Sequence, residues 1–125
     1  MRSFFSLVAL LMLSSASLAA PFLVAHRGAS KDAPENTLPA FELAWKQGAD
    51  AIEGDFYLTK DGKIVCFHDG DTKKITGKKL VVKDSTLAEL QALDVGEWRG
   101  KKFAGTRMPT LEQVLATVQI GRAHV

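Results

Sequence analysis

The folded part of the chain begins with a short apolar run followed by an amphipathic segment. Residues 21–25 are continuously apolar, which is typical of a strand buried on both faces, as in parallel sheets. Apolar residues then recur three and four positions apart, and this spacing predicts a helix over residues 38–47. Asn36 or Thr37 can cap that helix, because both side chains accept hydrogen bonds from free N–H groups of a first turn.

Two further apolar runs follow, joined by a turn signal. Residues 51–59 predict a second strand, and the Asp-Gly pair at 61–62 predicts a hairpin that returns through residues 64–67. The order of strand, helix, strand and hairpin indicates an α/β fold with parallel pairing of the first two strands. Two strand–helix units cannot close a barrel, because a (β/α)8 barrel takes eight and typically about 250 residues. We therefore expect the N-terminal part of a longer protein.

The rest of the chain is more polar. Residues 71–83 are basic and contain glycine, so we expect a solvent-exposed stretch there. Leucines three residues apart predict a short helix over residues 86–93, and residues 94–109 have a loop-like composition. Thr110 can cap a last helix that starts at Leu111.

Both ends of the chain are interpreted as lying outside the folded domain. Residues 1–19 combine a positive start, an apolar run and a small-residue exit, which together are typical of an export signal. The apolar run is shorter than the roughly 18 residues that a membrane span needs. Residues 120–125 back-translate to a common sequencing-adapter read, so we expect a non-native tail. The predicted domain is residues 20–119, periplasmic or secreted, without stable membrane insertion after removal of the signal.

Charge and cysteine content narrow the possible partners. The chain has 16 Lys and Arg residues against 14 Asp and Glu, and the difference is Arg2 and Arg122 in the two end segments. A neutral domain gives no support for binding to nucleic acid or to an anionic membrane. Cys66 is the single cysteine of the chain, so no internal disulfide can form, and we interpret it as a small apolar strand residue.

Glu53 and Asp55 are the most informative pair in the sequence. Side chains two residues apart in a strand point to the same face, so these carboxylates lie side by side, with Gly54 on the other face. Adjacent carboxylates in an otherwise apolar strand repel each other unless a cation neutralises them. Oxygen ligands suit a hard divalent ion, Mg²⁺ or Ca²⁺. The alternative is an edge strand whose polar face meets water.

Two histidines and an arginine stand at the ends of predicted strands. His26 and Arg27 follow the first strand, and His68 follows the return strand of the hairpin. Arg27 can bind a phosphate through two parallel hydrogen bonds, and each imidazole titrates near neutral pH. With the two acids they form a set able to cleave a phosphodiester: one imidazole assists attack and the other protonates the leaving alkoxide. A surface His-Arg pair without a function is the alternative.

Three more residues are candidates near these strand ends. Asn36 is expected to cap the helix, whereas Glu35 can reach the mouth of the site, to orient a group there or to contact the substrate. Trp98 belongs either to an apolar patch or to the mouth of the site.

A series of short motifs runs from about Leu23 to Leu115. They are His26-Arg27-Gly28, Pro34-Glu35-Asn36-Thr37 with Ala40-Phe41, Gly48-Ala49-Asp50 leading to Glu53-x-Asp55, Thr59-Lys60-Asp61-Gly62, Val65-x-x-His68-Asp69, Thr86-Leu87-x-Glu89-Leu90 and Pro109-Thr110-Leu111-Glu112. In this order and at this spacing, they resemble the glycerophosphodiester phosphodiesterase family. Gly54 is a departure, because a bulkier residue is more usual in the family. Since it faces the helix layer, we expect it to affect packing more than chemistry.

The resemblance implies a fold and an activity. The fold would be α/β, the N-terminal part of a TIM-type (β/α)8 barrel, truncated after about two strand–helix units. The activity would be metal-dependent hydrolysis of glycerophosphodiesters to glycerol 3-phosphate and an alcohol such as choline, ethanolamine or glycerol. The alternatives are a phospholipase D-like lyase on the same barrel, a non-catalytic module that binds phosphorylated glycerol compounds, and a fragment that is inactive by itself.

The resemblance also implies roles for individual residues. It assigns acid–base catalysis to His26 and His68, phosphate binding to Arg27, and metal binding to Glu53 and Asp55. Glu35 is added as a substrate-binding residue because of its place near the mouth of the site. The implied metal is Ca²⁺, with Mg²⁺ as the second candidate, and the substrate is a small-molecule glycerophosphodiester. A third carboxylate ligand usually comes from the next barrel strand in this family, beyond Leu115. Glu112 belongs to a loop–helix motif and is not taken as that ligand.

Overall fold

The structure is a computed structural model that describes residues 20–118. The predicted export signal, residues 1–19, and the predicted non-native tail, residues 120–125, lie outside the described residues. Among the helices of the described part, none is long and apolar enough to cross a bilayer.

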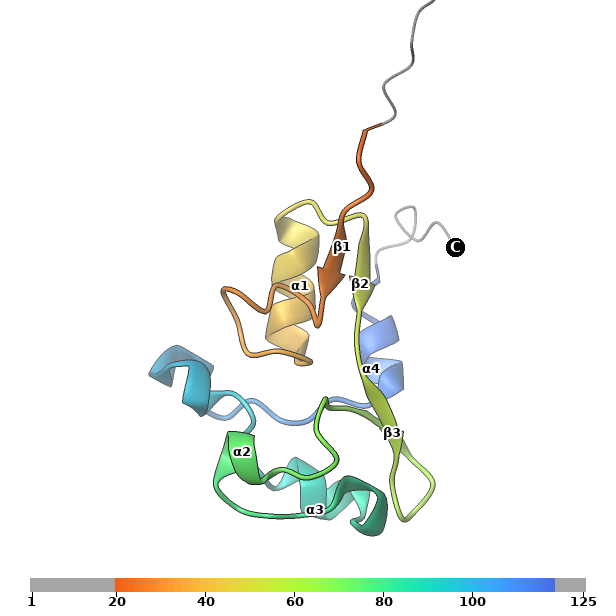
Figure 1. The fold of residues 1–125 in the computed structure, drawn as a ribbon, viewed down its shortest axis with the longest axis vertical. Helices are drawn as coiled ribbons and strands as arrows, with labels where there is room; N and C mark the ends of the chain where they lie inside the picture. Colours follow the sequence, from red (N-terminus) through yellow and green to blue (C-terminus); the bar gives the residue numbers. More distant parts are fainter. Residues whose placement is uncertain (1–19, 119–125) are drawn as a thin grey trace, which may run out of the picture.

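A parallel β–α–β unit forms the N-terminal half of the described chain (Figure 1). Strand β1 (Val24–His26) pairs in parallel with β2 (Ala51–Glu53), and the register places His26 opposite Glu53. Helix α1 (Leu38–Lys46) makes the crossover and lies against β2. The two arrowheads both point downward in the view, so the carboxyl ends of both strands lie at one edge of the sheet (Figure 1). The predicted parallel pairing is confirmed.

The N-cap of helix α1 is Thr37, one residue after the expected cap Asn36. The Thr37 hydroxyl accepts a hydrogen bond from the N–H of Ala40, whereas Asn36 has a left-handed backbone with φ 57° and lies outside the helix. Phe41 and Trp45 are buried on the apolar face that the periodicity predicts. The prediction that Asn36 caps this helix was therefore wrong, because its neighbour occupies that position.

A hairpin follows the parallel unit, but the long strand predicted over residues 51–59 is interrupted. Strand β3 (Phe56–Leu58) pairs antiparallel with β4 (Ile64–Cys66), and this pair forms a sheet separate from that of β1 and β2. The interruption falls at Gly54 and Asp55. The Asp-Gly turn and the return strand are as predicted.

The interruption has a specific cause in the hydrogen bonding of Asp55. Its backbone N–H donates to the side-chain oxygen of Asn36 over 3.0 Å, and its carbonyl accepts from the N–H of Phe67 over 2.9 Å. The bond from Phe67 continues the register of the β3–β4 hairpin, so it is Asn36 that takes the N–H which a further ladder bond would use. These partners lie 19 and 12 residues away, so local periodicity does not reveal them.

Residues 71–109 connect the hairpin to the last helix, α4 (Leu111–Leu115), and are termed the insertion. The insertion contains the helices α2 (Lys73–Thr76) and α3 (Leu87–Gln91) and the 3₁₀ turns η1 (Val82–Asp84), η2 (Glu97–Arg99) and η3 (Lys101–Phe103). The predicted helices at 86–93 and from Leu111 are confirmed. Both begin with capping boxes, built by Thr86 with Glu89 and by Thr110 with Gln113.

The sequence predicted a solvent-exposed stretch over residues 71–83, but part of this stretch is buried. Thr72 and Val82 are fully buried: Val82 packs against apolar side chains of the hairpin and of α3, and the hydroxyl of Thr72 makes hydrogen bonds within the stretch. That hydroxyl donates to the carbonyl of Lys78 over 2.6 Å and accepts from the N–H of Leu80 over 3.0 Å. The lysines of this stretch are exposed, whereas Thr72 is buried and fixes the stretch by its hydrogen bonds.

Two hydrophobic clusters share strand β4. The larger cluster lies under the insertion and consists of Val65, Phe67, Val82, Leu90, Val95 and Met108. The smaller one consists of Phe41, Cys66 and Val114, and it joins α1 and α4 to the strands. Because successive residues of a strand point to opposite faces, Val65 and Cys66 enter different clusters. Cys66 is fully buried in β4, in agreement with its interpretation as a small apolar strand residue.

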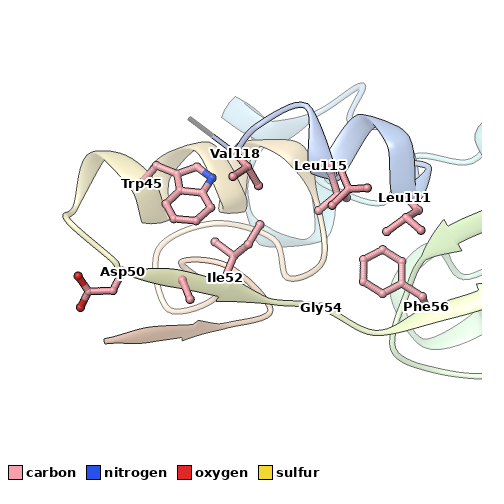
Figure 2. Close-up of a pocket in the computed structure, with 10 residues that line it drawn as sticks. Trp45, Asp50, Ile52, Gly54, Phe56, Leu111, Leu115 and Val118 are labelled. Atoms are coloured by element: carbon pink, nitrogen blue, oxygen red, sulfur yellow. The ribbon is translucent and has the colours of Figure 1, made fainter. Parts of the chain in front are cut away.

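Side chains alternate between two faces along β2 and the residues that follow it, and one face is apolar while the other is polar. Ile52, Gly54 and Phe56 face an apolar groove closed by Leu111 and Leu115 of α4 (Figure 2). A Cβ built on Gly54 would lie 3.1 Å from Phe41, so this glycine faces the helix layer, as expected. Glu53 and Asp55 alternate with these residues and face the other side.

Strand β1 is more exposed than its apolar sequence predicts. Phe22, Leu23 and Val24 keep 60%, 59% and 53% of their surface accessible. Within the described residues β1 pairs with β2 alone, so one edge of the strand has no strand beside it. The prediction of burial on both faces was wrong for this part of the chain.

Candidate active site

The candidate site residues lie at the carboxyl ends of three strands. His26 is the last residue of β1 and Glu53 the last of β2, and parallel pairing brings them directly opposite each other. His68 follows β4 by two residues. In α/β sheets this edge is where ligands bind, because the loops that follow the strands open there.

Arg27 is the centre of the site. Its backbone N–H donates to Glu53 Oε2 over 3.1 Å, and its Nη1 donates to Glu35 Oε1 over 3.3 Å. Its Nε lies 3.3 Å from Asp55 Oδ2 as an ion-pair contact, but this buried N–H makes no hydrogen bond within the described residues. Arg27 thus contacts three acidic residues, Glu53 through its backbone and Glu35 and Asp55 through its guanidinium.

The backbone at Arg27 and Asn36 is held in an unusual conformation. Both residues have positive φ angles, 59° and 57°, and the N–H of Asn36 donates to the carbonyl of Arg27 over 3.0 Å. A left-handed backbone costs non-glycine residues about 1–3 kcal/mol and persists where the surroundings fix it. The hydrogen bond between the two residues fixes both, and it brings the loop before α1 against the end of β1.

Glu53 and Asp55 present their carboxylates to the same space. The side chains are 42% and 31% exposed, so both remain accessible from solvent. Each uses one oxygen for contacts within the protein, Glu53 Oε2 toward Arg27 and Asp55 Oδ2 toward Asn36. Glu53 Oε1 and Asp55 Oδ1 accept no hydrogen bond from any described residue. Two free carboxylate oxygens fit a hard divalent cation.

The described residues alone do not complete a metal centre. They contain no group of three or more His, Cys, Asp and Glu side chains that could hold an ion. Glu53 and Asp55 would therefore supply two ligands, and further oxygens must come from outside the described residues or from water.

The two histidines differ in how tightly they are held. His26 is open to solvent, with its side chain 70% exposed and Nε2 3.8 Å from Glu53 Oε2. His68 Nδ1 lies 2.6 Å from Asp69 Oδ1, and the hydroxyl of Tyr57 donates to the His68 carbonyl over 3.0 Å. A carboxylate that accepts from Nδ1–H leaves Nε2 for proton exchange with a substrate.

His68 and Glu35 line the same small pocket. Its walls combine polar groups with an apolar side formed by Phe67, Ile75, Val95 and Trp98. The sequence placed Trp98 either in an apolar patch or near the mouth of the site. In the structure Trp98 lines this pocket. The pocket connects His68 to the group around Arg27, because Glu35 belongs to both.

Three residues of the site were missed by sequence reasoning. Asn36 binds Asp55 instead of capping α1, and Asp69 and Tyr57 hold His68. For Asn36 a signal existed, because Asn36 and Thr37 are both good caps and a helix has room for one. For Tyr57 no local signal exists, since its partner lies 11 residues away on the other strand of the hairpin.

Cys66 is a buried neighbour of the site that contacts Asn36. Its thiol donates to Asn36 Oδ1 over 3.2 Å. Burial raises the pKa of Cys66 to about 12, and the nearby charge of Asp55 adds to the shift. The sulfur therefore stays a protonated donor at neutral pH, in agreement with a structural role.

The sequence profile of the Glycerophosphoryl diester phosphodiesterase family matches residues 26–124. This match covers the strand ends and the loops that carry the site, so the chain belongs to this family. The expected fold class, the N-terminal part of a TIM-type barrel, is confirmed by the same comparisons.

Individual relatives agree with this assignment. The Bacillus subtilis relative YhdW is 55% identical over 94 residues, which are 75% of this chain and 39% of the relative. A glycerophosphodiester phosphodiesterase of Caldanaerobacter subterraneus is 49% identical over 96 residues, 77% of this chain and 40% of that protein. A solved Oleispira antarctica phosphodiesterase, in complex with the product sn-glycerol-3-phosphate, superposes with a TM-score of 0.74 at 39% identity. The match covers 78% of this chain and 39% of the Oleispira chain. The chain thus spans about two fifths of the length of these relatives.

Proposed function

We propose that the protein hydrolyses glycerophosphodiesters to glycerol 3-phosphate and an alcohol. The observation that carries the proposal is the Arg27 Nε–H, a buried cationic donor without a hydrogen-bond partner among the described residues. It lies 3.3 Å from Asp55 Oδ2, in the residue that follows His26, so this strand end offers a phosphate a cationic group and an acid–base group together. The family membership and the product bound by the Oleispira relative support the substrate class.

In the proposed reaction, Glu53 and Asp55 would hold a divalent cation, Ca²⁺ in the first place and Mg²⁺ as the alternative. When bound, the cation would neutralise charge on the phosphate. Arg27 would bind the same phosphate through its guanidinium, and Glu35 would hold that guanidinium in place and contact the substrate. These residues would orient the phosphorus toward the two histidines.

His26 and His68 would form the acid–base pair. One imidazole would take the proton from the nucleophile as its oxygen forms a bond to phosphorus. The other would give a proton to the alkoxide as the bond between phosphorus and the head-group oxygen breaks. The contact with Asp69 orients His68 for this exchange.

The substrate would reach the site from solution as a small molecule. The export signal expected over residues 1–19 would place the activity in the periplasm or outside the cell. Because the chain covers about two fifths of its relatives, experiments use the longest open reading frame that contains these residues, called the full-length protein below.

The test is turnover of glycerophosphocholine by the full-length protein, followed by phosphorus NMR. With Ca²⁺ we expect glycerol 3-phosphate as the phosphorus product, and we expect a chelator to abolish turnover until Ca²⁺ is added back. His68→Ala should lower the rate by about 10²–10⁴, the usual contribution of an acid–base group. Glu112→Gln in α4 is the matched control and should keep the wild-type rate, because Glu112 lies outside the site.

Other outcomes would contradict the proposal in different ways. A cyclic phosphate as the product would identify the lyase alternative. Tight binding of glycerol 3-phosphate without any turnover would identify a binding module. An unchanged rate in His68→Ala would remove that histidine from the mechanism.

A further inference from the structure

Asn36 is a buried polar residue, held at several points, next to the candidate site. It keeps only 2% of its surface accessible, its backbone is left-handed at φ 57°, and its N–H binds the carbonyl of Arg27. Burial of an amide side chain is costly unless its donors and acceptor find partners. The identity of those partners therefore indicates what the residue does.

The side chain of Asn36 binds Asp55 at two points. Its Nδ2 donates to Asp55 Oδ2 over 3.0 Å, and its Oδ1 accepts the backbone N–H of Asp55 over 3.0 Å. The thiol of Cys66 donates to the same Oδ1 over 3.2 Å. Two donors at the oxygen and one acceptor at the nitrogen fix which end of the amide is which.

This arrangement determines the direction of the Asp55 carboxylate. Binding at both the backbone and the side chain leaves the carboxylate little freedom to rotate. Oδ2 is engaged by Asn36 and contacts Arg27, whereas Oδ1 accepts no hydrogen bond within the described chain. The oxygen that remains free is the one that could bind a cation.

We propose that Asn36 is a positioning residue, which holds Asp55 so that Oδ1 faces the cation. The inference rests on the proposed function, since it needs the cation at Glu53 and Asp55. It extends that proposal to a residue that touches neither the cation nor the substrate. Partners of this kind, which orient a metal ligand, typically change metal affinity by about 10–100-fold when they are removed.

A role for Asn36 in starting α1 does not explain these contacts. The hydroxyl of Thr37 accepts the N–H of Ala40 and makes the cap. Among the described residues, the side chain of Asn36 contacts Asp55 and Cys66 and no N–H of the helix.

The test compares Ca²⁺ affinity by calorimetry in the wild-type full-length protein and in Asn36→Gly. Glycine tolerates the positive φ, so this change removes the side chain without adding backbone strain. We expect Ca²⁺ binding to weaken by about 10–100-fold, while circular dichroism shows a folded protein. Cys66→Ser keeps a donor toward Asn36 Oδ1, and we expect its Ca²⁺ affinity to stay within about threefold of wild type.

Thr86→Ala is the control for a purely structural effect. It removes the cap of α3 and should lower thermal stability, yet it lies in the insertion and should leave Ca²⁺ affinity unchanged. If Asn36→Gly binds Ca²⁺ as tightly as wild type, the inference is overturned and the proposed function stands. If wild type itself binds no Ca²⁺, Mg²⁺ or Mn²⁺, the metal part of the proposed function is overturned.

A second variant serves if Asn36→Gly does not fold. Asn36→Asp keeps an oxygen for the Asp55 N–H and for the Cys66 thiol, but it loses the N–H that holds Asp55 Oδ2. The added oxygen would repel that carboxylate oxygen from about 3.0 Å, the present distance to Nδ2. We expect weaker Ca²⁺ binding despite the extra negative charge, whereas equal or tighter binding would overturn the inference.

Discussion

Gly28 decides how closely the loop after β1 can approach α1. Its φ angle is 77°, and a Cβ on this residue would lie 2.7 Å from the carbonyl carbon and 2.8 Å from the Cβ of Ala40. The next residue uses this closeness, since the N–H of Ala29 donates to the carbonyl of Ala40 over 2.9 Å. Arg27 immediately precedes this turn, so its position depends on the contact between Gly28 and the helix.

Gly28→Ala should therefore destabilise the full-length protein by roughly 2–6 kcal/mol in urea unfolding. Both the left-handed backbone and the clash contribute, at about 1–3 kcal/mol each. Gly62→Ala is the matched control, because Gly62 has nearly the same φ, 75°, but open space around it. It should lose only the backbone part. Equal losses in the two variants would show that the contact with Ala40 does not matter.

At the residue scale, the sequence predicted the side chains at the strand ends and missed the residues that hold them, Asn36, Asp69 and Tyr57. The spacing of Glu53 and Asp55 is a local property of a strand, and their shared face follows from it. The use of Asn36 depends on Asp55, 19 residues away, and on the choice of Thr37 as the cap. Local propensity ranks Asn above Thr as a cap, so it favours the residue that does not cap the helix.

At the scale of elements, one carboxylate organises the second half of the insertion. Asp94 Oδ1 accepts the N–H groups of Gly96 and Glu97 over 2.8 and 3.0 Å, and Oδ2 accepts that of Gly105 over 2.5 Å. These backbone donors lower the pKa of Asp94 below its ordinary value. The turns η2 and η3 are thereby fixed to the segment that begins at Asp94, and Trp98 with them.

Asp94→Asn should lower stability at pH 7, because the amide presents N–H groups where Asp94 accepts them. A carboxyl whose pKa is lower in the folded state stabilises the fold above the unfolded pKa, and this stabilisation disappears as the pH falls through the folded pKa. The difference in melting temperature between wild type and Asp94→Asn should therefore shrink from pH 7 toward pH 3. A difference that is independent of pH would show that the charge of Asp94 contributes nothing.

Elements that begin with a local signal were predicted well, and those shaped by distant partners were not. Thr86 and Thr110 are the N-caps of α3 and α4, and each forms a capping box with a residue three positions later in the sequence. The strand predicted over residues 51–59 breaks at Asp55, where the side chain of Asn36 takes the backbone N–H that a ladder bond would use. The burial of residues 71–83 likewise depends on tertiary contacts that periodicity does not report.

At the scale of the whole molecule, two clusters rather than one hold the described chain together. Met108 is fully buried in the larger cluster, under the insertion, and the same cluster includes Phe67 next to His68. Gln91 ties α3 to this region by donating to the carbonyl of Met108 over 3.0 Å. The packing of the insertion and the position of His68 are therefore linked.

Met108→Ala should destabilise the full-length protein by roughly 2–5 kcal/mol, the usual range when a large buried side chain is truncated. Met108→Leu conserves the volume and should cost less than about 1.5 kcal/mol. Urea unfolding of the two variants measures both values. A loss below about 1 kcal/mol in Met108→Ala would mean that the cluster collapses around the gap or does not bear on the stability of the fold.

Strand β4 connects the packing of the insertion to the position of His68, and this connection bears on how members of the family can diverge. Val65 and Phe67 belong to one cluster and Cys66 to the other, and His68 follows at the end of the same strand. Substitutions inside the insertion can thus act on the position of the imidazole through Phe67, without replacing any residue that contacts Arg27. A preference for one head group over another would then change through substitutions that lie far from the residues proposed to bind the phosphate.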